Sequence, residues 1–83
     1  MNTLNDLQPN ESGIITEINL IGIMKRRLID LGVTPGTEIT MLRRAPLGDP
    51  VEFSILGYNL SLRRKEAKNI LIEKIEKAGV SND

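Results

Sequence analysis

Hydrophobic and polar residues alternate along three segments of the chain, at positions 12–18, 38–44 and 51–55. Alternation with a period of two is typical of a β-strand that buries one face and exposes the other. The sequence therefore predicts a strand in each segment. The pattern is cleanest in the third, where the hydrophobic face consists of Val51, Phe53 and Ile55.

The first of these segments departs from strict alternation. Ile14 and Ile18 are expected on its buried face and Glu17 on the opposite face, but Ile15 is hydrophobic as well. A strand that is partly buried on both sides, as at the corner of a barrel, would explain the position of Ile15.

A helix is predicted between the first two strands. Asn19 is expected to cap this helix or to lie in the turn before it. Ile23 falls beside Arg26 and Asp30 on the outer face, where it is either an ordinary exposed residue or a contact for a partner. The residues that recur at helical spacing and are expected to face the core are Ile21, Met24, Leu28 and Leu31.

Glycine and proline mark the end of the predicted helix. Gly32 is expected to close it with a positive φ, which would place Val33 against Leu28. Pro35 and Gly36 then fit the second and third positions of a type II turn. We expect these residues to shape the backbone rather than to take part in chemistry.

The C-terminal half is predicted to complete a small β-domain. Gly57-Tyr58-Asn59 can reverse the chain, so that residues 60–62 return as the partner strand of a hairpin. Residues 63–68 are expected to form one helical turn. Residues 70–74 suit a strand, although the hydrophobic spacing from 67 to 78 also fits a helix.

The two ends of the sequence are predicted to behave differently. Leu4 and Leu7 are the hydrophobic residues of a polar N-terminal segment and would hold it against the core. Small and polar residues dominate the other end. We expect one domain over residues 1–75 and a flexible tail over residues 76–83.

Two prolines bracket a short loop between the second and third strands. Its residues are Pro46, Leu47, Gly48, Asp49 and Pro50. Because proline restricts the backbone, this loop has little conformational entropy to lose on binding. It therefore suits a contact surface for a partner, with Leu47 presented on a stiff frame. The alternative is that Leu47 folds back over one end of the core.

Composition argues against an enzyme or a metal carrier. The chain has 83 residues and contains neither cysteine nor histidine, which removes thiolate chemistry, imidazole bases and the usual transition-metal ligands. Its carboxylates are scattered along the sequence rather than clustered. We therefore expect no catalytic residue, no metal site and no cofactor.

Charge gives little support to nucleic-acid binding. The formal net charge is zero, although basic residues gather at 25–27, 43–44 and 63–65 and could form one basic face. Phe53 and Tyr58 are the only aromatic side chains available for stacking.

The uncharged run at the start of the predicted helix is much shorter than the roughly 20 residues of a membrane span. We expect a cytoplasmic protein.

Several short motifs together resemble one known family. They are Arg27-Leu28, Asp30-Leu31-Gly32, Pro35-Gly36, the loop from Ala45 to Pro50, Leu60-Ser61-Leu62-Arg63 and Glu66-Ala67. With these motifs, residues 3 to about 74 resemble FeoA, the small cytosolic accessory protein of bacterial ferrous iron transport. The resemblance implies a mainly β fold: a five-stranded SH3-like barrel with one helix after the first strand and a helical turn before the last.

The resemblance also implies a function and a partner. FeoA-like domains are thought to bind and modulate FeoB, the membrane permease that carries a cytosolic G-protein domain, so any membrane association would pass through FeoB. The contact residues that we expect are Ile23, Arg26 and the 46–50 loop. The alternative is a metal-linked regulatory module like the C-terminal domain of DtxR-type repressors. Self-association stays open.

Overall fold

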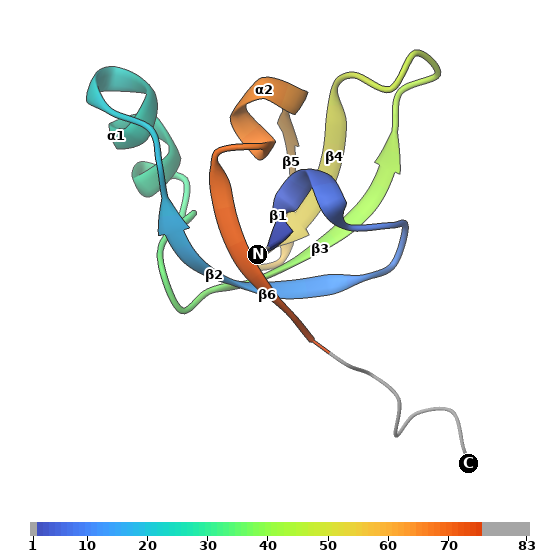
Figure 1. Ribbon diagram of the computed structural model, residues 1–83, viewed down its shortest axis with the longest axis horizontal. Coiled ribbons are helices and arrows are strands. Elements are labelled where there is room, and N and C mark those ends of the chain that lie inside the picture. Colours follow the sequence, from blue (N-terminus) through green and yellow to red (C-terminus); the bar gives the residue numbers. More distant parts are fainter. Residues whose placement is uncertain (1, 76–83) are drawn as a thin grey trace.

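The computed structural model describes residues 2–75, which form a six-stranded antiparallel sheet with strand order β1-β6-β2-β3-β4-β5. The sheet curls around one core, and α1, α2 and the loop between β3 and β4 rise on the same side of it (Figure 1). The strands are β1 (Asn2–Thr3), β2 (Ser12–Ile18), β3 (Glu38–Arg44), β4 (Val51–Ile55), β5 (Tyr58–Leu62) and β6 (Ile70–Ile75). The helices are a 3-10 turn η1 (Leu4–Asp6), α1 (Gly22–Asp30) and α2 (Arg64–Ala67).

The mainly β fold predicted from the sequence is confirmed. β2, β3 and β4 have the predicted bounds, and the segment from residue 70 is a strand rather than a helix. The sheet adds one strand to the five that were predicted, because Asn2 and Thr3 pair with Ile72 and Leu71. The tail predicted for residues 76–83 lies outside the described residues.

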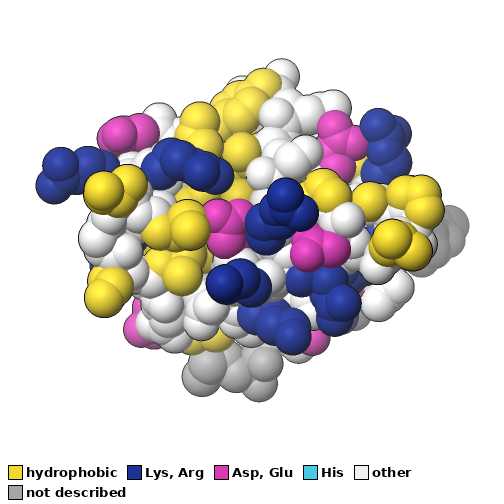
Figure 2. All heavy atoms as spheres, turned by 90° about the horizontal axis from the view of Figure 1, so that it is seen from above, with side chains coloured by type: hydrophobic (Ala, Val, Ile, Leu, Met, Phe, Trp, Pro, Cys, Tyr) yellow, Lys and Arg dark blue, Asp and Glu magenta, His cyan; other side chains and the backbone are white. Residues whose placement is uncertain are grey.

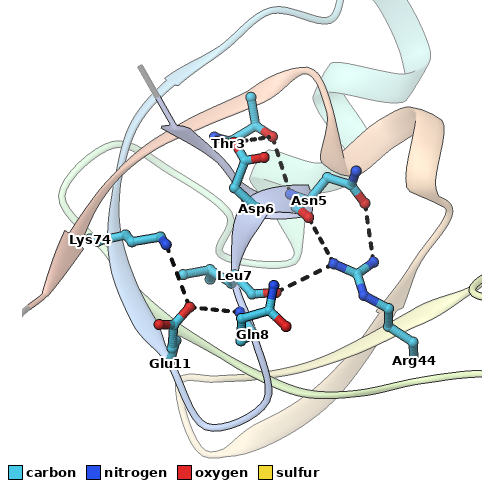
Figure 3. A network of polar contacts seen from close by, with 8 residues as sticks. All are labelled: Thr3, Asn5, Asp6, Leu7, Gln8, Glu11, Arg44 and Lys74. Atoms are coloured by element: carbon cyan, nitrogen blue, oxygen red, sulfur yellow. Dashed lines mark hydrogen bonds and ion pairs between the residues drawn. The ribbon is translucent and has the colours of Figure 1, made fainter.

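The N-terminal segment is fastened to the core in the way that the sequence predicts. Leu4 and Leu7 are fully buried. Around them, the guanidinium of Arg44 donates to the carbonyl oxygens of Asn5 (2.7 Å) and Leu7 (3.3 Å) and to Oδ1 of Asn5 (3.2 Å), as Figure 3 shows. Arg44 is therefore a structural residue rather than part of a free basic patch.

A β-bulge changes the expected pattern of β2. The pairing of β2 with β6 shifts between Ile15 and Glu17. Because a bulge adds one residue to the strand, the side chains after it exchange faces relative to those before it. Ile15 and Ile18 are consequently both buried, whereas Ile14 is only partly buried. The prediction that Ile14 and Ile18 share the buried face was wrong.

The turn between β4 and β5 lies earlier than predicted. Its two residues are Leu56 (φ 51°) and Gly57 (φ 86°), so Tyr58 already belongs to β5 and pairs with Ile55. Two consecutive positive φ values fit the type I′ geometry that suits the twist of a hairpin. The prediction placed the reversal at residues 57–59 because these include residues that tolerate a positive φ, whereas leucine rarely adopts one.

Helix α1 is much more exposed than its hydrophobic stripe predicts. Leu28 is buried and Leu31 packs against the core, but Ile21 is 88% exposed and Met24 is 39% exposed. The prediction that all four residues face the core was therefore wrong. The physical reason is that α1 stands at one end of the sheet, so that mainly its C-terminal end meets the rest of the domain (Figure 1).

The start of α1 also differs from the prediction. The N-cap residue is Ile21, which provides no side-chain hydrogen bond to the helix. Asn19 lies before this position, and its backbone N–H donates to the carbonyl of Asn69 (2.7 Å). Asn19 is thus in the segment leading to the helix, which was the second of the two places considered for it.

Candidate functional site

The C-terminal end of α1 is held by the predicted glycine cap. Gly32 has a φ of 93°. Its N–H donates to the carbonyl of Ile29, and the N–H of Val33 donates to the carbonyl of Leu28, both at 2.9 Å. These are the two hydrogen bonds of a Schellman motif, and the side chains of Leu28 and Val33 are both fully buried. The cap therefore fixes the direction in which α1 leaves the domain.

Further contacts to this end of α1 come from the β4–β5 turn and from the first residue of β5. The phenolic O–H of Tyr58 donates to the carbonyl of Leu31. The side chain of Leu56 lies so close to Gly32 that a Cβ at position 32 would collide with it.

The type II turn that follows is formed as predicted, because Gly36 has a φ of 94° and the N–H of Thr37 donates to the carbonyl of Thr34 (3.1 Å).

The N-terminal end of α1 exposes large hydrophobic side chains. Ile23 is 87% exposed, much like Ile21, and the basic residues Lys25 and Arg26 are exposed beside them. A shallow groove of about 610 Å³ runs along the helix, lined by Thr16, Glu17, Ile18, Asn19, Leu20, Ile21, Lys25, Ile29 and Pro35. Hydrophobic side chains that stand in solvent next to a groove are typical of an interaction surface.

The β3–β4 loop presents Leu47 at its tip. Two backbone hydrogen bonds close the loop: the N–H of Gly48 donates to the carbonyl of Ala45 (2.7 Å), and the N–H of Ala45 donates to the carbonyl of Pro50 (2.9 Å). Leu47 is 94% exposed, so the alternative in which it folds back over the core is wrong. The peptide bond between Asp49 and Pro50 is cis.

Asp49 connects this loop to α2. Its Oδ1 accepts a hydrogen bond from the backbone N–H of Arg64, the first residue of α2, at 3.0 Å. The first N–H groups of a helix have no partner inside the helix, so a carboxylate from elsewhere can satisfy one of them. Asp49 thus has a structural role that the sequence did not reveal.

Glu66 connects α2 to α1. It is one of the few buried polar side chains, at 5% exposure, and its Oε1 accepts from the backbone N–H of Arg63 (2.9 Å). Its Oε2 lies 3.8 Å from Nη2 of Arg27 on α1. Glutamate three residues after the cap is a known sequence signal for this backbone contact. The ion pair to α1 has no such signal.

Together these contacts build one surface, which we call the upper face (residues 21–31, 45–50 and 63–68). α2 lies between α1 and the β3–β4 loop (Figure 1) and is bonded to both. Viewed from this side, hydrophobic side chains gather at two ends of the molecule with charged side chains between them (Figure 2). Ile23 and Arg26 therefore lie on the same side as the predicted 46–50 loop, but α2 separates the two groups.

Two ion pairs lie on the rest of the described domain. Nη2 of Arg43 lies 2.9 Å from Oε1 of Glu52, and Nζ of Lys74 lies 3.6 Å from Oε1 of Glu11. Among residues 2–75, three or more carboxylates do not come together in a way that could hold a metal ion. In the same part of the chain, no helix is long and hydrophobic enough to cross a membrane.

Comparison with known proteins identifies the family. The model of the FeoA domain matches residues 2–74. The chain belongs to the FeoA family. This family is associated with Fe²⁺ transport in bacteria, which confirms the resemblance seen in the sequence motifs.

The relatives of this FeoA-family protein include both separate and fused domains. A fusion of Fe(2+) transport protein A with the Fe(2+) transporter FeoB from Porphyromonas gingivalis (strain ATCC BAA-308 / W83) is 34% identical over 79 residues. The match covers 95% of this chain but 9% of the fusion protein, so the chain spans a small part of that relative.

Solved structures agree with the FeoA assignment. The FeoA protein of Chlorobium tepidum has a TM-score of 0.86 at 35% identity, covering 90% of this chain and 71% of that one. The FeoA of Stenotrophomonas maltophilia, described as an SH3 domain protein and solved with zinc, has a TM-score of 0.77 at 26% identity, covering 88% and 91%. The SH3-like architecture predicted from the family is thereby confirmed.

A DtxR-like regulatory role gains no support beyond the fold. A manganese-dependent transcriptional repressor superposes with a TM-score of 0.80, covering 89% of this chain and 36% of the repressor. Its identity to this FeoA-family chain is 17%, so the likeness concerns the architecture alone.

Proposed function

We propose that this protein is a non-catalytic accessory factor of ferrous iron transport that binds the FeoB permease on its cytoplasmic side and modulates its activity. The observation that carries the proposal is the upper face, where Leu47 is 94% exposed on a closed loop and Ile23 is 87% exposed on a capped helix. The fused relative supports FeoB as the partner, because there one chain combines the two proteins.

The construction of the upper face suits binding. Burying a leucine or isoleucine side chain contributes roughly 1.5–3 kcal/mol of stabilisation. Leu47 and Ile23 are exposed in the folded domain, so this contribution is still available when a partner binds. The loop hydrogen bonds and the contact of Asp49 with Arg64 limit the ordering needed when a partner binds. We propose Ile23, Arg26 and residues 46–50 as the contact residues.

Modulation requires that the protein prefer one state of FeoB. A domain that binds two states of the permease equally well cannot shift the balance between them, however tightly it binds. We therefore expect this protein to bind FeoB with different affinities in different nucleotide states. Two of the three carboxylates on the upper face, those of Glu66 and Asp49, accept backbone hydrogen bonds within the domain.

The test measures binding to the purified cytosolic domain of FeoB with and without guanine nucleotides, together with nucleotide hydrolysis and iron uptake. Leu47→Glu should abolish binding because it places a charge in the centre of a desolvated contact. Leu56→Glu is the matched control, since it makes the same change at an exposed leucine of the β4–β5 turn. Circular dichroism must show both variants folded. Unchanged binding of folded Leu47→Glu removes the loop from the interface.

A further inference from the structure

The upper face carries a strong excess of positive charge in a chain that is neutral overall. Its three segments contain seven basic residues: Lys25, Arg26, Arg27, Arg63, Arg64, Lys65 and Lys68. They contain three acidic residues: Asp30, Asp49 and Glu66. The net charge of the upper face is therefore +4. Because the formal net charge of the chain is zero, the rest of the sequence has a net charge of −4.

Two of the three acidic side chains on this face are already engaged. Asp49 accepts a hydrogen bond from the N–H of Arg64, and Glu66 is buried beside Arg27. The Glu66 carboxylate is thereby withdrawn from solvent, whereas Asp49 and Asp30 are exposed. Lys25, Arg26 and Lys65 are exposed as well, and exposed basic residues outnumber exposed acidic ones on this face. A ligand that approaches this side meets mainly cationic groups.

The hydrophobic side chains of the upper face stand at its two ends. Ile21 and Ile23 lie at the start of α1, and Leu47 lies at the tip of the β3–β4 loop. Figure 2 shows this face with hydrophobic groups at both ends and, between them, Lys and Arg side chains with acidic side chains among them. Side chains that are about nine-tenths exposed stand clear of their neighbours, and a fluid surface can accept them without a matching pocket.

We propose that the upper face binds the surface of an anionic lipid bilayer. Ile23 and Leu47 enter the boundary between headgroups and acyl chains, while Lys25, Arg26 and Lys65 contact lipid phosphates. Exposed hydrophobic residues combined with a cluster of basic residues are the two signals that peripheral membrane binding requires. This inference extends the proposed function: weak lipid binding concentrates the protein at the membrane in which its permease is embedded.

The test is sedimentation of the whole protein with vesicles that contain no permease. Vesicles of phosphatidylcholine mixed with phosphatidylglycerol should bind the protein, and vesicles of phosphatidylcholine alone should bind it far less. Added salt should weaken the binding because it screens the cationic groups. Absence of binding to the mixed vesicles, or equal binding to both kinds, overturns the proposal.

Matched variants locate the binding surface. Arg26→Glu should lower the partition coefficient about fivefold or more, since each basic residue near an anionic membrane contributes a factor of that order. Lys74→Glu makes the same change of charge on β6, where Lys74 pairs with Glu11, and should have a smaller effect. Equal losses in the two variants overturn the assignment to the upper face.

A second pair of variants tests the hydrophobic contribution. Ile23→Ser combined with Leu47→Ser should lower vesicle binding at least about tenfold, whereas Leu56→Ser should not. The same variants are then tested for capture by the cytosolic domain of FeoB. Capture by that domain without vesicle binding assigns the face to protein and overturns the lipid proposal alone. Vesicle binding without capture leaves the lipid proposal standing and removes the proposed function.

Discussion

Arg27 of α1 and Glu66 of α2 form an ion pair in which one partner is exposed and the other is buried. Nη2 of Arg27 lies 3.8 Å from Oε2 of Glu66, and the side chains are 56% and 7% exposed. Oε1 of Glu66 accepts from the N–H of Arg63. One carboxylate therefore joins the start of α2 to α1, while the N–H of Arg64 joins α2 to the β3–β4 loop.

This asymmetry predicts unequal effects of removing the two partners. Glu66→Ala should lower the free energy of unfolding by about 1–3 kcal/mol, because it leaves the partly buried backbone N–H of Arg63 without its charged acceptor. Arg27→Ala should cost less than about 1 kcal/mol, since its guanidinium is half exposed and screened by solvent. Urea denaturation of both single variants and of the double variant measures the loss of unfolding free energy in each. Equal losses in the two single variants would contradict this view of the pair.

The cap of α1 predicts a clash that can be separated from backbone strain. Alanine at a positive φ costs roughly 1–2 kcal/mol at either Gly32 or Gly36. At Gly36 the new Cβ meets open space, whereas at Gly32 it collides with Leu56. The colliding atom is the end of a side chain that is 68% exposed and can move aside, so Gly32→Ala should destabilise the protein by no more than about 1 kcal/mol beyond Gly36→Ala.

Thermal and urea denaturation of both glycine variants check this difference. Combining Gly32→Ala with Leu56→Ala should remove the excess, after correction for Leu56→Ala alone. If Gly32→Ala exceeds Gly36→Ala by clearly more than about 1 kcal/mol, the side chain of Leu56 is held in place and cannot move aside.

The basic pair Arg43-Arg44 predicts two distinct outcomes for neighbouring residues. Arg44→Lys should cost about 1–2 kcal/mol, because a single ammonium cannot reproduce the fork that reaches the carbonyls of Asn5 and Leu7. Arg43→Lys should cost less than about 0.5 kcal/mol, since Arg43 is exposed beside Glu52. Hydrogen exchange in residues 2–7 should rise in Arg44→Lys only. A similar rise in both variants would mean that Arg44 does not hold the N-terminal segment.

Much of the β-fold could be predicted because the sequence signals for its strands and turns lie within short segments of the chain. Alternation gave β3 and β4 their bounds, and Gly32 marked the end of α1, since each signal depends on a few neighbouring residues. The bulge in β2 could not be predicted in the same way. It depends on the pairing with β6, and it exchanges the faces of Ile14 and Ile15 relative to Ile18.

The elements of the upper face could be predicted from the sequence, but the contacts that join these elements could not. Helical spacing shows that Ile21 and Leu28 share one side of α1, but it does not show how far the rest of the domain extends along that side. Glu66 carries a local signal for its contact with Arg63. Its pairing with Arg27 depends on the placement of two helices that are distant in the sequence.

Asp49 is the residue for which the structure most changes the expected effect of a substitution. Sequence reasoning placed it among the partner contacts, but its Oδ1 accepts from the N–H of Arg64 at 3.0 Å. Asp49→Ala should therefore destabilise the protein by about 1 kcal/mol, as does the loss of a helix cap. It should also weaken FeoB binding indirectly by releasing the loop that carries Leu47.

Asp49→Asn separates these two roles. The amide keeps an oxygen acceptor for Arg64 and removes the charge, so stability should change by only about a few tenths of a kcal/mol. If Asp49 acts by positioning the loop, Asp49→Asn retains FeoB binding while Asp49→Ala loses it, and hydrogen exchange of the Arg64 amide rises only in the alanine variant. Loss of binding in Asp49→Asn with unchanged stability would instead mean that the carboxylate itself contacts the partner, because the loop would still be held in place.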